Sequence, residues 1–238
     1  MIIQYWSDYA CPYCYIGETH LKKALGEIQN ERGLLTDVAI EMRAFELDPH
    51  ASKKYTGETV DRFAAKYGLS LQKAAEQIES ISQMGRDAGL DFRYAQTRYT
   101  NTFDAHRLTK AAQFLNKTTL ADRISERLYR AYFSEGLELA DREVLVKIAM
   151  EEGMDEEKVR MMLDSDKYAD EVRFDEQEAA RYGIYSVPCF VVNGKTAIPG
   201  ALSVEQMKRV LLELVEREAQ LERDEGMSCG SDGCHIGF

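Results

Sequence analysis

The 238-residue sequence contains few residues that interrupt a helix, with only four prolines and sixteen glycines. Its middle is instead rich in Ala, Glu, Leu, Arg, Lys and Gln, which favour helix over strand. Hydrophobic residues make up 45% of the chain, enough to build a core, so disorder is excluded as the main state. We therefore expect an α/β protein with helix in excess.

The sequence also lacks an excess of basic residues and lacks long hydrophobic runs. Lysine and arginine total 30 against 41 acidic residues, a net charge of −11, so a nucleic-acid partner is not expected. No apolar stretch approaches the roughly 20 residues of a membrane span, and residues 1–6 lack the basic start of a signal peptide. These absences predict a soluble, cytosolic protein with no membrane partner.

The sequence has five cysteines, which are Cys11, Cys14, Cys189, Cys229 and Cys234. A reducing cytosol and an ample core argue against structural disulfides, so redox chemistry or metal binding is the better interpretation.

Hydrophobic periodicity predicts strand, helix and strand at the start, a long helical block, and a strand hairpin followed by a last helix. The first strand is expected at 2–6, followed by a helix with Pro12 in its first turn, and the second strand at about 38–45. Expected helices of the block lie near 58–67, 71–88, 101–116, 118–133, 141–151, 155–163 and 166–181. Asn193-Gly194 predicts the turn of the hairpin, and Ser203 caps a last helix that runs to about Arg223.

The motif Cys11-Pro12-Tyr13-Cys14 stands where the first strand gives way to a helix. Cys11 at a helix N-terminus faces unpaired N–H groups, which favour a thiolate. Cys14 lies one turn further on the same side, where it can resolve a mixed disulfide formed at Cys11. The alternatives are an accidental pair or half of a zinc site, for which Cys229, Cys234 and His235 are the only candidate further ligands.

Three segments resemble the DsbA-like branch of the thioredoxin superfamily, and within it the FrnE-like proteins: residues 7–17, residues 101–108 and residues 183–191. The resemblance covers about residues 1–220. It implies a thioredoxin-like fold interrupted by a large all-helical insertion. We expect a discontinuous thioredoxin-like domain at 1–50 and 182–224, the insertion at 51–181, and a flexible cysteine-containing tail at 225–238.

The same resemblance implies roles for particular residues. Cys11 is the expected nucleophile, Cys14 the resolving thiol, and Val187-Pro188 a cis-proline turn beside them. A proline that opens a strand has no N–H to donate, and the Val187 backbone would then be free to pair with a substrate strand.

The resemblance also places a helix with Phe103 and His106 over the mouth of the site, with Asn101 as its cap. A capped helix with a half-buried His106 is the plainer reading of that segment. Cys189 is expected to be a small buried hydrophobe of a central strand.

The tail segment 229–235 has two cysteines around glycines, and a second redox pair, Cys229 and Cys234, is the first hypothesis for it. Soft-metal capture by Cys229, Cys234 and His235 and an inert tail remain open.

The leading functional prediction is a thiol–disulfide oxidoreductase, with isomerase and oxidative-stress roles open, acting without a cofactor on disulfide-containing proteins or small thiols. We expect it to be a monomer or homodimer. Two alternatives stay open. One is a glutathione-dependent kappa-type transferase or 2-hydroxychromene-2-carboxylate isomerase, relatives that usually present serine in place of Cys11. The other is a metal- or redox-responsive binding protein.

Overall fold

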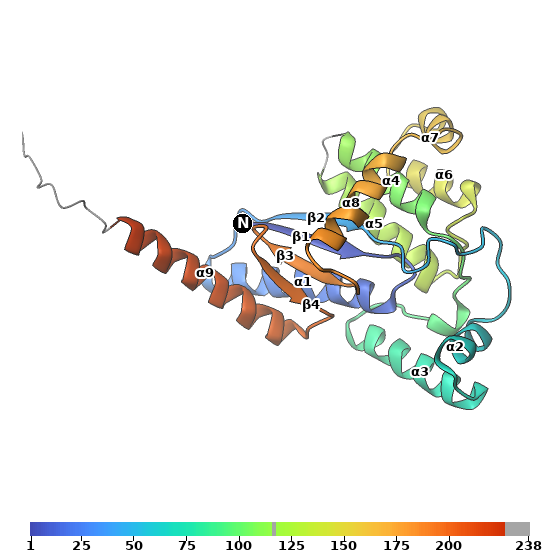
Figure 1. Ribbon diagram of the computed structural model, residues 1–238, viewed down its shortest axis with the longest axis horizontal. Coiled ribbons are helices and arrows are strands. Elements are labelled where there is room, and N and C mark those ends of the chain that lie inside the picture. The colour runs from blue at the N-terminus through green and yellow to red at the C-terminus, as the bar shows by residue number, and fades with distance from the viewer. Residues whose placement is uncertain (116–117, 227–238) are drawn as a thin grey trace, which may run out of the picture.

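The computed structural model describes residues 1–115 and 118–226 of the chain, in which four strands are surrounded by helices (Figure 1). The strands are β1 (Ile2–Ser7), β2 (Ala39–Ala44), β3 (Cys189–Val192) and β4 (Thr196–Pro199). The helices are α1 (Pro12–Arg32), α2 (Thr59–Tyr67), α3 (Leu71–Asp87), the short 3-10 helix η1 (Tyr94–Gln96), α4 (Phe103–Phe114), α5 (Thr118–Phe133), α6 (Arg142–Glu151), α7 (Glu156–Leu163), α8 (Ala169–Arg181) and α9 (Val204–Gly226).

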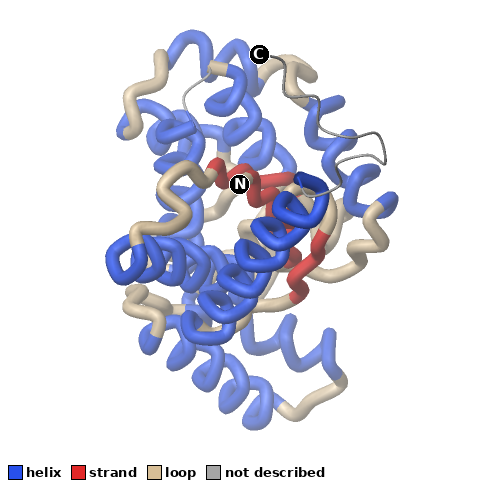
Figure 2. Tube along the Cα trace, turned by 90° about the vertical axis from the view of Figure 1, so that its left-hand side faces the viewer, coloured by secondary structure: helices blue, strands red, loops and turns tan. Residues whose placement is uncertain are grey.

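The sheet has the order β2-β1-β3-β4, with β2 parallel to β1 and the other neighbours antiparallel. Figure 2 shows these strands in the middle of the molecule, between layers of helix. Asn193 and Gly194 at the β3–β4 turn both have positive φ, 50° and 65°, as the predicted Asn-Gly hairpin requires. The predicted strand and helix pattern is confirmed, with shifts of one to three residues at most ends.

Alternation along the strands separates two hydrophobic faces, because successive side chains point to opposite sides. Tyr5 and Phe190 belong to the main core with residues of α1 and α9, such as Leu21 and Met207. Trp6 belongs to a second cluster with Cys189, Val191, Ala179 of α8 and Ile184. Helices α1 and α9 therefore cover one face of the sheet and α8 covers the other, as the ribbon also shows (Figure 1).

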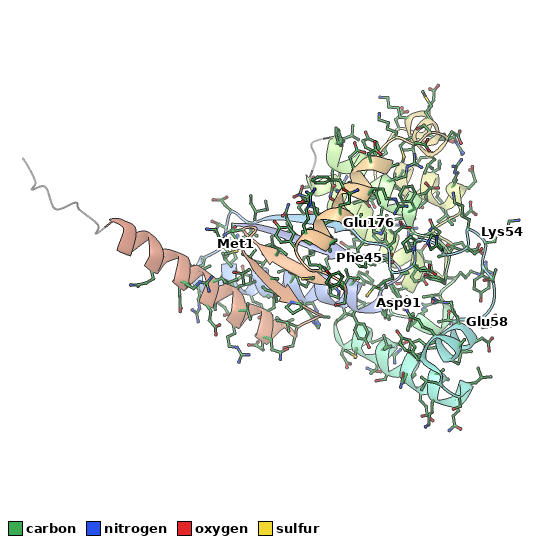
Figure 3. All side chains as sticks on the ribbon, in the orientation of Figure 1. Met1, Phe45, Lys54, Glu58, Asp91 and Glu176 are labelled. Carbon is green, nitrogen blue, oxygen red and sulfur yellow. The ribbon has the colours of Figure 1, made fainter. Side chains whose placement is uncertain are left out.

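All helices from α2 to α8 lie between β2 and β3 in the chain, which confirms a helical insertion between strands. Helix α8, at the end of the predicted insertion, packs directly on β2. Side chains fill the space between the sheet and the surrounding helices (Figure 3). The domain limits predicted from the sequence stay a prediction.

The buried carboxylate of Asp175 connects α8 to the sheet. Its Oδ1 accepts from Arg43 Nη1 at 3.1 Å, its Oδ2 accepts from the Ala44 backbone N–H at 2.7 Å, and Lys110 Nζ of α4 forms an ion pair with Oδ2. The backbone carbonyl of Asp175 also accepts from Trp6 Nε1 at 2.7 Å. One side chain thus fixes α8, α4 and β2 against each other.

Candidate functional site

The dithiol motif is positioned by the junction between β1 and α1. Cys11 is the N-cap of α1 in an extended conformation, and its N–H donates to the Asp8 carbonyl at 3.0 Å. Pro12 occupies the first turn, where its missing N–H costs no hydrogen bond. The Cys14 N–H donates to the Cys11 carbonyl at 3.1 Å, which closes the first turn between the two cysteines.

The loop before β3 reaches Cys11 from the other side. Cys11 Sγ lies 3.6 Å from the Val187 carbonyl oxygen, to which its thiol donates, and the Val187-Pro188 peptide bond is cis, as expected. Gly17 of α1 permits this approach, because a Cβ at position 17 would lie 3.1 Å from Pro188 Cγ. The structure therefore brings Cys11, Val187 and Pro188 together from distant parts of the chain.

Both thiols are buried, with exposed fractions of 3% for Cys11 and 0% for Cys14, and of the two only Cys11 lines the cleft described below. Burial, and then the adjacent Cys11 sulfur, raise the pKa of the Cys14 thiol well above its usual value, while hydrogen bonding to Ser7 acts in the opposite direction. Ser7 Oγ is itself hydrogen-bonded to the Tyr129 hydroxyl of α5. Cys11 and Cys14 are both free thiols in this structure.

Asp8, which sequence reasoning did not single out, orders the loop between β1 and α1. Its Oδ1 accepts from the Ala10 N–H at 3.2 Å and its Oδ2 from the Leu47 N–H at 2.7 Å. His106 Nε2 lies 3.6 Å from Asp8 Oδ1, and both side chains are buried. The imidazole ring of His106 also packs on Tyr9, with ring centroids 4.9 Å apart. His106 is therefore next to the dithiol loop, fully rather than half buried.

The placement of Asn101 and Phe103 near the mouth of the site stays a prediction. Neither residue lines the cleft at Cys11, nor does His106. The N-cap of α4 is Thr102, and Asn101 accepts from the Phe103 N–H at 3.0 Å from one position earlier. Asn101 Nδ2 donates to the buried Glu46 at 3.2 Å, and Phe103 lies under the Arg173 guanidinium at 4.3 Å. Asn101 and Phe103 thus contact residues of the β2–α2 loop and of α8.

The cleft at Cys11 has a volume of about 430 Å³ and is walled mainly by α2 and α3. From the dithiol side it is lined by Ala10, Cys11, Pro12, Tyr13 and Val187, and from the loop after β2 by Leu47. The opposite wall consists of Arg62, Phe63, Lys66, Tyr67, Gln77, Ser80, Ile81, Met84, Tyr94 and Tyr99. Tyr13 is 40% exposed at its edge. The sequence analysis did not identify this wall. The available signal was the four-residue spacing on α2 of Arg62 with Lys66 and of Phe63 with Tyr67, which places each pair on one face of the helix.

The remaining cysteines lie apart from the dithiol. Cys189 is buried in the second cluster, on the opposite face of the sheet from Cys14, and burial raises its pKa. It is a small buried hydrophobe of an interior strand, as expected. The predicted second pair, Cys229 and Cys234, and the candidate metal ligand His235 lie outside the described residues.

Residues 1–115 and 118–226 contain no group of three or more His, Cys, Asp or Glu side chains arranged to hold a metal ion. No helix within the same ranges combines the length and apolar character needed to cross a bilayer.

Residues 2–212 match the family model of the DSBA-like thioredoxin domain. The chain therefore belongs to this family and has its thioredoxin-like fold with a helical insertion, and with the Cys11 and Cys14 pair it is a DsbA-family oxidoreductase.

Among solved structures, a probable DsbA oxidoreductase from Streptomyces coelicolor is 31% identical, with all of both chains covered and a TM-score of 0.81. The uncharacterized protein YwbO of Bacillus subtilis is 25% identical over 214 residues, which cover 88% of this chain and 94% of that protein. A 2-hydroxychromene-2-carboxylate isomerase shares the fold at 13% identity and a TM-score of 0.66, over 93% of this chain and 99% of its own.

Proposed function

We propose that this protein is a thiol–disulfide oxidoreductase in which Cys11 attacks the substrate and Cys14 resolves the mixed disulfide. The observation that carries the proposal is that, of the two thiols, only Cys11 lines the cleft. Cys11 lines the cleft, whereas Cys14 lies fully buried behind it with a raised pKa. A substrate can therefore reach the first sulfur and not the second.

The exchange proceeds in two displacements. The Cys11 thiolate attacks one sulfur of the substrate disulfide, the substrate S–S bond breaks, and the other substrate sulfur leaves as a thiolate. The attacked sulfur is now bonded to Cys11 in a mixed disulfide. Cys14 then loses its proton and attacks the Cys11 sulfur, which releases the attacked substrate sulfur as a second thiolate. The substrate gains two electrons, and the protein keeps a Cys11–Cys14 disulfide that an external thiol must reduce. The reverse sequence oxidises a dithiol substrate.

The surroundings of Cys11 suit this sequence. The Val187 carbonyl at 3.6 Å fixes the direction of the thiol. The apolar side chains of Leu47, Phe63 and Met84 in the cleft can cover a substrate segment beside its disulfide. We propose disulfide-containing proteins or small thiols as substrates, with a main chain paired to Val187, and a monomer or homodimer in the cytosol. Membership of the FrnE-like subfamily, disulfide isomerisation and an oxidative-stress role belong to the same proposal.

The cytosolic disulfide reductase DsbM of Pseudomonas aeruginosa shares the fold at 16% identity and a TM-score of 0.61, with 93% of this chain and all of that chain covered. The likeness to this reductase and the likeness to the isomerase are both likenesses of fold alone. The Cys11 and Cys14 dithiol of this chain favours thiol–disulfide exchange over the isomerase alternative.

Turnover on insulin disulfides, with dithiothreitol as the reductant, tests the proposal. The wild-type chain should accelerate insulin reduction, Cys11→Ser should abolish the acceleration, and Cys14→Ser should stall at a mixed disulfide. Cys189→Ser is the matched control, because Cys189 lies on the other face of the sheet. Full activity of Cys11→Ser would refute the mechanism. Turnover of a chromene carboxylate with glutathione would favour the isomerase alternative.

A further inference from the structure

The cleft at Cys11 differs in charge from the rest of the molecule. The chain has a net charge of −11, yet the cleft lining contains two cationic side chains, Arg62 and Lys66, and no carboxylate. A cleft lined by one sign of charge concentrates ligands of the opposite sign. The lining of the cleft is therefore cationic, although the chain as a whole is acidic.

Arg62 is held in place without a counterion. Its guanidinium stacks on the Tyr99 ring, with 3.8 Å between Cζ and the ring centroid, and its Nε is buried without a hydrogen-bond partner. Within residues 1–115 and 118–226, no carboxylate lies within ion-pair distance of this guanidinium. By contrast, Arg43, Arg107 and Arg173 each form an ion pair. A positioned guanidinium with free donors is suited to a planar carboxylate.

Lys66 follows Arg62 by one turn of α2, so the two side chains share a face of the helix. Lys66 is exposed, and its Nζ lies 5.5 Å from the Tyr67 ring centroid at the edge of the cleft. Glu58, the N-cap residue of α2, is exposed, and Figure 3 labels it at the outer end of that helix, away from the sheet. One half-buried and one exposed cation, Arg62 and Lys66, thus line the same cleft as Cys11.

We propose that Arg62 and Lys66 form an anion-binding subsite of the dithiol cleft, which selects disulfides that carry a carboxylate near the scissile bond. The proposal rests on the function proposed above and adds the substrate class. The volume of about 430 Å³ fits a small disulfide or a short peptide segment rather than a folded domain. The carboxylate can belong to a small molecule or to an acidic residue of a peptide.

Single-turnover kinetics of the reduced protein with two aromatic disulfides separate charge recognition from thiol reactivity. 5,5′-dithiobis(2-nitrobenzoate) carries a carboxylate on each ring, and 4,4′-dithiodipyridine is neutral at pH 7. The readout is the ratio of their rate constants, normalised to the same ratio for a simple thiol. Arg62→Gln should lower the rate with the anionic disulfide by about tenfold, and Lys66→Gln by about threefold. Each variant loses a charge-assisted hydrogen bond to the carboxylate, which is stronger than a hydrogen bond between neutral groups. The rate with the neutral disulfide should stay unchanged.

Matched controls identify the cause. Arg209→Gln removes the same charge from the exposed face of α9, far from the cleft, and should change neither rate. Arg62→Lys should restore part of the anionic preference, and added salt should reduce it. If Arg62→Gln fails to fold, Lys66→Glu on the exposed position still tests the subsite, with a larger loss on the anionic disulfide.

Two further pairs of substrates identify the source of the carboxylate. A small aliphatic disulfide with carboxylates and a disulfide-linked peptide with acidic neighbours are each compared with neutral counterparts. Dependence on Arg62 for the peptide pair alone assigns the subsite to acidic peptides, and dependence for the small pair assigns it to small disulfides.

Equal slowing of the neutral and anionic disulfides by Arg62→Gln, or no effect of either variant, would overturn the subsite. Failure of the proposed function is a different result, in which Cys11→Ser retains full reactivity with both disulfides.

Discussion

Gly17 of α1 lies against Pro188, at a separation where a Cβ on residue 17 would be 3.1 Å from Pro188 Cγ. This contact seats the loop before β3 on the first turns of α1. The Val187 carbonyl, which accepts from Cys11 Sγ, belongs to the same loop. A side chain at position 17 would therefore press on the loop that holds the Val187 carbonyl against Cys11.

Gly17→Ala should slow thiol–disulfide exchange several-fold, because the new methyl group pushes Pro188 and Val187 away from Cys11. Gly26→Ala is the control, since Gly26 lies on the same helix with nothing within 4 Å of the new Cβ. Gly26→Ala should raise stability by about 0.5–1 kcal/mol through helix propensity and leave exchange unchanged. Stopped-flow exchange and urea unfolding measure both effects. Equal gains in stability and unchanged exchange for both variants would contradict the seating role.

Cys14 should react with iodoacetamide much more slowly than Cys11, because Cys14 is fully buried and its pKa is raised. Mass spectrometry of briefly alkylated, reduced protein gives the order of modification. A raised folded-state pKa means that the folded protein holds the Cys14 proton more tightly than the unfolded chain. The corresponding stability is present below the unfolded pKa of about 8.5 and is lost as the pH rises above it.

Cys14→Ala should flatten the alkaline decrease in stability of the reduced protein, measured by urea unfolding between pH 7 and pH 10. Modification of Cys14 before Cys11, or an alkaline decrease that Cys14→Ala leaves intact, would show that burial does not separate the two thiols.

Asp175→Ala should destabilise the protein by about 3–5 kcal/mol, because it leaves the buried Lys110 ammonium and the Ala44 N–H without their partner. Glu143→Gln removes an acid that pairs with Arg160 on the surface and should leave the urea midpoint unchanged. Matching midpoints for the two variants would show that the buried carboxylate does not hold α8 on the sheet.

The paired cysteines of the tail, Cys229 and Cys234, are predicted from the sequence to exchange with the active-site dithiol. A Cys229→Ser, Cys234→Ser double variant should change the rate of reoxidation without a change in the unfolding midpoint. Peptide mapping after graded oxidation should find a Cys229–Cys234 disulfide or a bridge to Cys11. Free tail thiols throughout cycling of Cys11 and Cys14 would exclude the relay, and stoichiometric zinc binding lost with Cys229→Ser would favour the metal alternative.

The sequence predicted the local features well because their causes are local. Alternation marked the strands, Asn193-Gly194 marked the hairpin, and a strand–helix junction with Cys11 and Pro12 marked the dithiol. The walls of the cleft could not be predicted, since which helix faces Cys11 depends on packing over the whole insertion. The sequence analysis did not identify Asp8 and Asp175 as structural residues. A buried carboxylate is identified by its hydrogen-bond donors, and Leu47, Arg43 and Ala44 lie far from these two residues in the sequence.

The most direct test is trapping of the substrate on the Cys14→Ser variant, followed by intact-mass and peptide mass spectrometry. A disulfide substrate should add one half of its mass to the protein, at Cys11, and the adduct should be released by reductant. The wild-type chain under the same conditions should show a Cys11–Cys14 disulfide and no lasting adduct. An adduct at Cys189, or no adduct at Cys11 while the variant still turns over substrate, would contradict the role of Cys11 as the attacking thiol.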